Sequence, residues 1–482
     1  MSLTHAIAKN TSVQIVGKTF STLLGLAAVA IMTHTLGVEK FGWYVTATGF
    51  LQFVGIFSDF GFTIITAKML SEPEFDKTDL INNLFTWRFI TAFVFQALAP
   101  LLILLFPYPV EIKMAVAIMS LSFFAISLNN IFIGYCQSNL KMAIQMTGEV
   151  LGRIILVLGL ILVASKNYPA HGGTPLQSGG GFLWAMGIIT LASVFYTFYL
   201  WLKTPRVKFA INAQISKAIF YKIWPTATTV IFNAFYLQGD RVILPLYVSQ
   251  TEVGLYGAAY RILDIITQSA GMIMGIMMPL VAFAWSRNLV DEFKKRYQTS
   301  LDLVALFLAP MMAGIVVLAN PIMLLIGGQG FAGSGRILQF LSIAIIGISF
   351  GNIFGYIALA IDRQKQALWI YISDAILTVI AYFVFIPRYG IYGAAGAAVF
   401  SELYAGIGLM LLANHYAKFT PRFKALGKIV LASAIMGAAI YRLQPMNIMI
   451  SILLGVVIYT TLVLLFKVVS KETIKEIVGQ KL

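Results

Sequence analysis

The stretch VSQTEVGLYGAAYRILDIITQSAGMIMGIMMPLVAFAW, from Val248 to Trp285, is apolar enough to cross a lipid bilayer but carries two charged residues. At 3.6 residues per helical turn, its small and polar residues share one face. That face comprises Gly257, Arg261, Asp264, Gln268, Gly271 and Gly275. An ionisable side chain at membrane depth costs about 3 kcal/mol or more unless it is paired or faces water. Arg261 and Asp264 therefore either serve a ligand or pair with each other inside a helix bundle.

The composition is that of a polytopic membrane protein. Hydrophobic residues make up 59% of the 482 residues, charged residues 11%, and the mean hydropathy is +0.86. Soluble domains carry about 25% charged residues. The single cysteine, Cys136, excludes an intramolecular disulfide framework and a cysteine-built metal site. The acidic loop between Ser71 and Asp79 is interpreted as solvated, so no metal site is predicted.

Apolar stretches of about 20 residues predict membrane-spanning helices, and their positions indicate an all-α fold. Fourteen such helices are expected, at 12–35, 43–66, 82–106, 113–136, 145–165, 181–202, 219–248, 253–285, 297–326, 335–361, 366–387, 390–413, 425–441 and 447–467.

The placement of Lys and Arg orients these helices, because basic residues concentrate in cytoplasmic segments. Most of the 34 basic residues fall in inner segments when the N-terminus is inside. Both termini are therefore predicted to be cytoplasmic. The net charge of +15 reflects this topology and contact with anionic lipids, not nucleic acid. Five basic residues fall within predicted helices: Lys18, Arg88, Arg153, Arg241 and Arg261.

An internal repeat has an offset of 212 residues. The segment Leu36–Leu51 aligns with Val248–Leu263, with Gly42 matching Gly254 and Tyr44 matching Tyr256. An offset that spans six helices repeats the same topology, so it implies two parallel six-helix lobes. We therefore expect an N-terminal lobe at 1–210 and a C-terminal lobe at 211–424. Two additional transmembrane helices and a cytoplasmic tail are expected at 425–482.

Polar stripes on four predicted helices are expected to converge on a cleft between the lobes. A bundle that needed only packing would place small residues there, without so many charges. Besides the stripe that holds Arg261, the three others comprise Thr11, Gln14, Lys18, Ser21 and Gly25; Thr48, Gln52, Gly55, Asp59 and Thr63; and Thr226, Thr229, Asn233, Tyr236 and Asp240.

Several motifs carry a family resemblance: LGVEKFGWY from Leu36, SDFG from Ser58, VGLYGAAYRI from Val253, and PRYGIYGAAGAA from Pro387. With them the chain resembles the polysaccharide-repeat flippases (Wzx type) of the multidrug/oligosaccharidyl-lipid/polysaccharide (MOP) superfamily. The resemblance implies a MATE/MOP-like fold and alternating access. It also implies a lipid-linked oligosaccharide flippase, which turns a polyprenyl-diphosphate-linked sugar repeat unit from the cytoplasmic to the outer leaflet for O-antigen, capsule or exopolysaccharide assembly.

The expected helix count also resembles that of the peptidoglycan lipid-precursor flippases of this superfamily. In that group the last two helices help to form a groove for the lipid tail. The location expected from these resemblances is the bacterial cytoplasmic (inner) membrane. The expected partners are the lipid-linked oligosaccharide, membrane lipids, and a polysaccharide polymerase with its chain-length regulator.

The main hypothesis is that the five intramembrane basic residues bind the diphosphate, since Arg offers a planar fork of donors. Lys18 and Arg153 lie toward the cytoplasmic side and Arg261 toward the middle or outer half, so an outward relay is possible. The alternatives are that Arg88 snorkels to the headgroups and that Arg153 pairs with Glu149 on one helix. For Arg241 they are a local pair with Asp240 or anchoring at the membrane interface.

Other polar residues complete the predicted site. Coupling to an H⁺ or Na⁺ gradient, or cavity salt bridges, is assigned to the carboxylates of Asp59, Asp264, Asp374 and Glu402. Sugar contacts are assigned to Gln52, Tyr236, Tyr256, Tyr260 and Gln268. No cofactor is predicted.

Rival functions differ in the charge and loops that they need. A cation-coupled multidrug antiporter of the same fold would favour an acidic or apolar cavity. A membrane glycosyltransferase would be an enzyme, but the predicted outer loops are short and no catalytic constellation is evident. We therefore predict a transporter and not an enzyme.

Overall fold

The computed structural model describes residues 3–71, 75–166, 179–443 and 447–468. These residues form helices joined by short loops, and no strand occurs among them. Eleven of the described helices are long and apolar enough to cross a membrane. That count agrees with the fourteen predicted spans, because two long kinked helices each contain two predicted spans and α7 is not among the eleven. The predicted all-helical, multi-pass membrane architecture is confirmed.

The described chain packs into two compact units. Unit 1 comprises Met1–Leu255 with Ile326–Gly330, and unit 2 comprises Tyr256–Leu325 with Phe331–Leu482. These units are defined by packing and the predicted lobes by the repeat, so the lobes at 1–210 and 211–424 stay a prediction.

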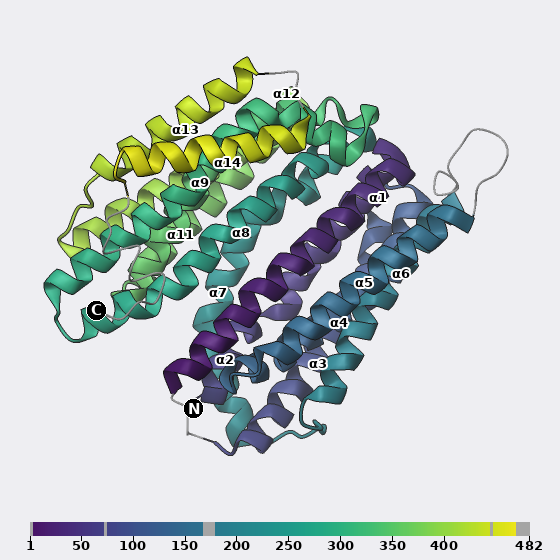
Figure 1. Ribbon diagram of the computed structural model, residues 1–482. Coiled ribbons are helices and arrows are strands. Elements are labelled where there is room, and N and C mark those ends of the chain that lie inside the picture. Colours follow the sequence, from purple (N-terminus) through teal and green to yellow (C-terminus); the bar gives the residue numbers. More distant parts are fainter. Residues whose placement is uncertain (1–2, 72–74, 167–178, 444–446, 469–482) are drawn as a thin grey trace. The chain divides into compact units, whose positions relative to one another are not determined.

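Unit 1 is a bundle in which α5 packs against both α1 and α6, while α4 contacts α3 and α6 (Figure 1). Its apolar core joins four helices through Leu84, Ile131, Leu200 and Ile219. Its helices are α1 (Leu3–Asp59), α2 (Phe62–Ser71), α3 (Lys77–Leu102), α4 (Val110–Ser138), α5 (Met142–Lys166), α6 (Gly179–Lys203) and α7 (Ala213–Ile243).

Helix α1 bends at Gly37, which has a φ of 75° and a ψ of 173°. Few residues other than glycine adopt this backbone conformation, so the residue type fixes the position of the bend. The part before the bend packs on α5, and the part after it packs on α3, α4 and α7. Two spans that the sequence predicts separately are therefore one bent helix.

The predicted helix at 43–66 is wrong at its C-terminal end. The chain leaves α1 after Asp59 through Phe60 and Gly61, which have φ values of 45° and 88°. The Asp59 carboxylate accepts hydrogen bonds from the Gly61 N–H and from the Thr63 hydroxyl, and so stabilises this turn. The SDFG motif is therefore a helix break and not the interior of a span.

The acidic loop before α3 caps that helix. The Asp76 carboxylate accepts hydrogen bonds from the N–H groups of Thr78 at 2.8 Å and Asp79 at 3.1 Å. These donors hold the pKa of the Asp76 carboxyl below its usual range. Glu72 and Glu74 lie outside the described residues.

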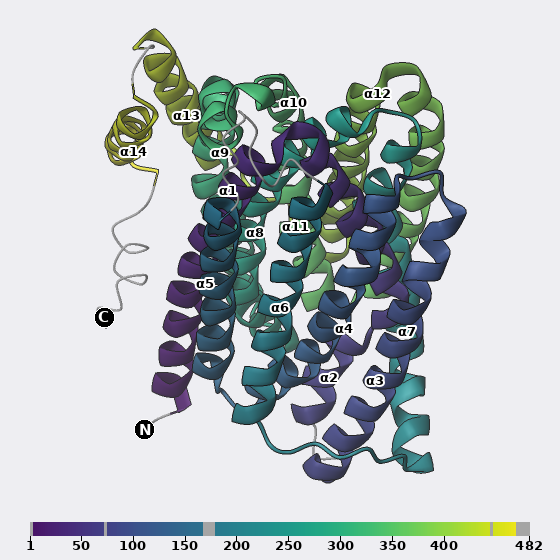
Figure 2. The same cartoon turned by 90° about the vertical axis from the view of Figure 1, so that its right-hand side faces the viewer.

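Unit 2 contains most of α8 (Gln250–Ser286) together with six further helices (Figure 2). Helix α12 bends at Gly390, where φ is 56°, so it also merges two predicted spans. The single span predicted at 335–361 is divided into two helices, α10 and α11. The further helices are α9 (Val290–Gly327), α10 (Ser334–Leu341), α11 (Ala344–Ala360), α12 (Gln364–Ala417), α13 (Lys424–Arg442) and α14 (Ile448–Leu465).

The last two helices pack on α9. Leu318 of α9 forms an apolar cluster with Met436 and Ile440 of α13. The Tyr459 hydroxyl of α14 donates a 2.8 Å hydrogen bond to the backbone carbonyl of Leu306. Helices α13 and α14 are therefore integral parts of unit 2.

Helix α1 and the first turn of α8 cross at two glycines. A Cβ atom on Gly42 would lie 1.8 Å from the carbonyl oxygen of Gln250, and one on Gly254 would lie 2.2 Å from that of Val38. Both distances are far below any van der Waals contact. Gly42 and Gly254 are 212 residues apart, and so are Val38 and Gln250. The crossing is therefore symmetric with respect to the sequence repeat.

We expect Gly42→Ala and Gly254→Ala each to lower the free energy of unfolding by about 1–3 kcal/mol, because the added methyl group forces two backbones apart. Thermal unfolding of the purified protein in detergent measures the effect. The control is Gly187→Ala in α6, where no atom lies within 4 Å of the added Cβ. If the crossing variants melt at the same temperature as the control, the backbone contact is not a structural constraint.

Candidate functional site

The charged residues predicted within the spans of unit 1 lie in three separate places. Each place joins helices that are distant in the sequence, so the partners could not be identified from local spacing. Lys18 and Arg153 belong to the first place, Arg88 to the second and Arg241 to the third.

The first place is the contact of α1 with α5. The Lys18 ammonium lies 3.1 Å from a Glu149 carboxylate oxygen, and the Ser21 hydroxyl donates a 2.7 Å hydrogen bond to the same oxygen. The Glu149 carboxylate of α5 therefore binds two side chains of α1. The Lys18 side chain is 38% exposed and that of Glu149 14%. Lys18 thus keeps surface through which it can contact a second anion.

Arg153 extends this cluster by one turn of α5. A Cβ atom on Gly25 of α1 would lie 3.9 Å from the Arg153 guanidinium. Gly25 of α1 thus lies next to the Arg153 guanidinium of α5. Lys18, Ser21 and Gly25 share one stripe, as the sequence predicted. The structure brings this stripe together with Glu149 and Arg153, and we call these five residues the α1–α5 cluster.

The second place is the interior of unit 1 around Arg88. Its guanidinium lies 2.8 Å from the Asp59 carboxylate and donates hydrogen bonds to the carbonyls of Ser127 at 2.9 Å and Ser58 at 3.1 Å. The Arg88 side chain is 1% exposed. These contacts stabilise a buried cation that ties the end of α1 to α3 and α4.

The structure thus joins Arg88, predicted to bind diphosphate, with Asp59, for which a coupling role and a salt bridge were both predicted. Snorkelling, the other reading of Arg88, does not describe a side chain with almost no exposed surface.

The third place is the contact of α1 with α7. The Arg241 guanidinium donates hydrogen bonds to Gln52 at 2.8 Å and to Gln238 at 3.2 Å. Its backbone N–H donates to the Asp240 carboxylate at 2.8 Å. A Cβ atom on Gly49 would lie 2.8 Å from the Arg241 Cβ. Gly49 is therefore small because α7 packs closely against it.

In unit 2, the predicted residues of α8 differ in exposure. Arg261 and Asp264 are half-buried and Gln268 is exposed. Tyr256 and Tyr260 are buried, with ring centroids 5.6 Å apart. The side chain of Tyr236 in α7 lies outside the described residues.

Asp374 of α12 is fully buried at 0% exposure. Its two carboxylate oxygens accept hydrogen bonds from the hydroxyls of Thr378 and Ser401, each at 3.0 Å. Among the described residues these two hydroxyls are its hydrogen-bond partners, and no basic side chain joins them. Glu402 adjoins Ser401 and is 8% exposed, and its backbone packs on Gly347 of α11. This part of α12 thus holds two buried carboxylates.

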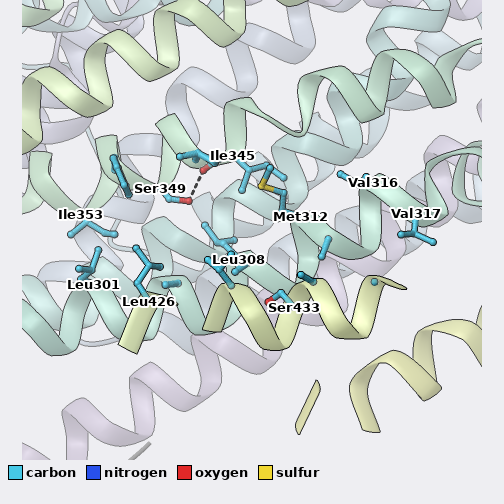
Figure 3. Close-up of a pocket in the computed structure, with 18 of the residues that line it drawn as sticks. Leu301, Leu308, Met312, Val316, Val317, Ile345, Ser349, Ile353, Leu426 and Ser433 are labelled. Atoms are coloured by element: carbon cyan, nitrogen blue, oxygen red, sulfur yellow. Dashed lines mark hydrogen bonds between the residues drawn. The ribbon is translucent and has the colours of Figure 1, made fainter. Parts of the chain in front are cut away.

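Unit 2 also contains an apolar pocket of about 470 Å³ between α9, α11 and α13 (Figure 3). Leu308, Met312 and Ile353 are among the side chains that line it. Its hydroxyl groups, on Ser349 and Ser433, donate hydrogen bonds to carbonyls of their own helices. The pocket therefore offers only apolar contacts to an occupant, and its volume is in the range of ligand sites.

Sequence reasoning missed three of these features. It considered Arg153 of the same helix as a partner for Glu149 and did not identify Lys18 and Ser21 of α1 as further partners. It allowed a salt bridge for Asp59 but did not identify Arg88 as the partner. It also placed no residues in the α9–α11–α13 pocket, since apolar side chains that line a pocket have the same pattern as those that face lipid.

These features define an all-helical, multi-pass membrane protein with charged contacts between its helices. The family described as polysaccharide biosynthesis protein matches residues 7–285. The chain belongs to this family.

Two relatives are described as transport proteins. The probable low-salt glycan biosynthesis flippase Agl15 of Haloferax volcanii is 23% identical over 51% of this chain and 53% of its own length. The succinoglycan biosynthesis transport protein ExoT of Rhizobium meliloti is 22% identical over 70% of this chain and 66% of its own. The chain thus matches about half of the first relative and just under two thirds of the second.

Solved structures show the fold. The lipid II flippase MurJ in an inward closed conformation has a TM-score of 0.75 and 16% identity, covering 94% of this chain and 98% of MurJ. An inward-facing multidrug resistance MATE family transporter of the MOP superfamily has a TM-score of 0.65 and 16% identity, covering 85% and 98%. The MATE/MOP-like fold expected from the sequence is confirmed.

We expect Arg88→Met to destabilise the protein by about 3–5 kcal/mol, because it leaves the Asp59 carboxylate without its cation. The double variant Arg88→Met/Asp59→Leu is expected to recover part of this loss. Thermostability followed by size-exclusion chromatography measures both. Equal stability of Arg88→Met and the unaltered protein would show that the pair is not structural.

Proposed function

We propose that this protein is a flippase for lipid-linked oligosaccharides. It moves a polyprenyl-diphosphate-linked sugar repeat unit from the cytoplasmic to the outer leaflet during surface polysaccharide assembly. The family membership and the two relatives described as flippase and transport protein support this proposal. The observation that carries it is the α1–α5 cluster, where a cation remains accessible within a helix of the bundle.

The proposed orientation places both termini in the cytoplasm and the protein in the bacterial cytoplasmic membrane. The excess of Lys and Arg in alternate loops supports it. In this orientation the crossing of Gly42 and Gly254 lies on the outer side, just after the bend of α1 at Gly37 and close to the start of α8. A polymerase and its chain-length regulator would receive the sugar repeat at that face.

The diphosphate is proposed to bind first at Lys18 and Arg153. Phosphate oxygens accept strong charge-assisted hydrogen bonds from ammonium and guanidinium groups. The Glu149 carboxylate holds the Lys18 ammonium in place and lowers the net charge of the empty site. Arg261 on α8 remains the candidate for a later position in the relay. Arg88 has no part in this proposal, because each of its three guanidinium nitrogens has a partner inside unit 1.

The polyprenyl tail is proposed to use the apolar pocket between α9, α11 and α13. The tail is a hydrocarbon and needs no hydrogen-bond partner, and the pocket offers none. Helix α13 lines one wall and is positioned by α14 and α9. Sugar contacts remain assigned to Gln52, Tyr236, Tyr256, Tyr260 and Gln268, although Gln52 is already bonded to Arg241.

Alternating access is proposed to require opening at the glycine crossing. Two backbones in direct contact leave no passage between them, so a bulky sugar cannot leave at this point while the contact lasts. Because the contact at the two glycines is between backbones, its opening requires little change of side-chain rotamers there. The Thr46 hydroxyl donates a 2.8 Å hydrogen bond to the Gln250 side chain and marks the same contact.

We expect Lys18→Gln to reduce flipping roughly tenfold or more with little change in stability, since it removes one charge-assisted contact. The assay uses vesicles that contain the purified protein and a fluorescent polyprenyl-diphosphate glycan, and measures accessibility of the label to a membrane-impermeant reductant. The control is Lys113→Gln at the start of α4, outside the cluster. Absence of flipping by the unaltered protein would refute the function, whereas full activity of Lys18→Gln would refute only the site.

Asp374 is the proposed coupling residue, and it also supports the second candidate function, a cation-coupled antiporter of this fold. A carboxylate with two hydroxyl neighbours can bind a proton or Na⁺ through oxygen atoms. We expect Asp374→Asn to abolish the dependence of flipping on an imposed H⁺ or Na⁺ gradient. If the gradient dependence persists in Asp374→Asn, coupling resides elsewhere. Gradient-driven export of organic cations without flipping would favour the antiporter.

A further inference from the structure

The segment between α6 and α7 is an extended strap that is fixed to α3. The N–H groups of Lys208, Ala210 and Asn212 donate hydrogen bonds to the side chains of Asn82 at 2.8 Å, Thr86 at 2.9 Å and Asn83 at 2.6 Å. Alternate residues of an extended chain direct their N–H groups to the same side. Three consecutive donors on that side are therefore satisfied, and the strap is held in one place.

The strap presents exposed cations. Lys203, Arg206 and Lys208 are all exposed, and none has an acidic partner among the described residues. Because the backbone that carries these cations is already fixed, binding an anion costs side-chain entropy but no further ordering of the strap. In the proposed orientation these three residues lie at the cytoplasmic surface.

A second apolar pocket adjoins the strap. It has a volume of about 280 Å³ and is lined by residues of α3, α4 and α6. On α4 its lining runs from Leu121 to Phe132, roughly 16 Å at 1.5 Å per residue. It is therefore long and narrow along the helix axis. Leu121 and Phe198, which line it, are 54% and 51% exposed, so it opens at the surface of unit 1.

Aromatic contacts connect the pocket to the strap. Trp201 lines the pocket two residues before Lys203, where α6 ends. Phe85 also lines it, and its ring lies 5.6 Å from that of Phe209, the neighbour of Lys208 in the strap. The cations therefore lie at one end of the pocket, the end nearest to the C-termini of α4 and α6.

We propose that the strap and this pocket form a binding site for an anionic glycerophospholipid of the cytoplasmic leaflet. One acyl chain occupies the pocket between α3, α4 and α6. The phosphate contacts Arg206 and Lys208, with Lys203 beside them. The site is separate from the α1–α5 cluster and from the pocket of unit 2, and the proposal does not depend on the transported substrate.

The occupant is inferred from the combination of charge and shape. A zwitterionic lipid would leave the cations of the strap without a net counter-charge, whereas an anionic headgroup supplies it. A soluble anion would not use the pocket, and a neutral hydrocarbon would not use the cations. Phosphatidylglycerol is therefore a suitable probe.

The test uses Trp201 as a reporter, because brominated acyl chains quench tryptophan fluorescence on contact. The protein is reconstituted in phosphatidylcholine bilayers with an equal mole fraction of either brominated phosphatidylglycerol or brominated phosphatidylcholine. The contribution of Trp201 is the quenching lost in Trp201→Phe. We expect brominated phosphatidylglycerol to quench Trp201 more strongly than brominated phosphatidylcholine. The affinity ratio of the two lipids should fall roughly fivefold for each cation removed in Arg206→Gln/Lys208→Gln.

The matched control is Arg287→Gln/Lys294→Gln, which removes two exposed cations of unit 2 and should leave the preference unchanged. Equal quenching of Trp201 by both lipids would mean ordinary contact with bulk lipid and would overturn the proposal. Displacement of phosphatidylglycerol from Trp201 by a polyprenyl-diphosphate glycan would also overturn it, because the pocket would then belong to the substrate.

Discussion

The direct contact of two backbones at Gly42 and Gly254 is the constraint on which the account of this protein depends. Any side chain at either position would collide with a carbonyl of the other helix. The first turn of α8 therefore belongs to unit 1, whereas the remainder of α8 belongs to unit 2. Helix α8, with its half-buried Arg261 and Asp264, continues from an end that this crossing fixes. The crossing therefore fixes the start of α8 against α1 through a backbone contact, to which the Thr46–Gln250 hydrogen bond adds.

Around this crossing, the charges of unit 1 divide into those that stabilise the bundle and those that remain accessible. Arg88 is almost fully buried and uses its donors on Asp59 and on two backbone carbonyls. Lys18 has one carboxylate partner and remains more than one third exposed. Burial of a cation is tolerated only when its donors are satisfied, so the two residues have different roles although both occur within apolar sequence. This difference is what favours a phosphate site at the α1–α5 cluster.

The sequence alone was sufficient to predict the helices, the membrane class and the basic residues within spans, because hydropathy and charge act over short distances along the chain. It also paired Gly42 with Gly254. It could not show that these glycines touch, that Lys18 reaches Glu149 over 131 residues, or that Arg88 meets Asp59. Such contacts depend on helix packing, for which residue spacing carries no information. The turn at Phe60 and Gly61 was missed because its apolar flanks continue the pattern of a span.

The most direct test of the central claim is to lock the glycine crossing during transport. Thr46→Cys/Gln250→Cys in a Cys136→Ala background places two thiols where the side chains now share a hydrogen bond. A short, reducible thiol cross-linker would join them. The control pair is Ser122→Cys/Ser193→Cys, whose hydroxyls are 2.7 Å apart between α4 and α6. Cross-linking at 46 and 250 is expected to stop flipping, and reduction to restore it, whereas the control pair is expected to flip normally. Undiminished flipping by the protein cross-linked at 46 and 250 would contradict the account.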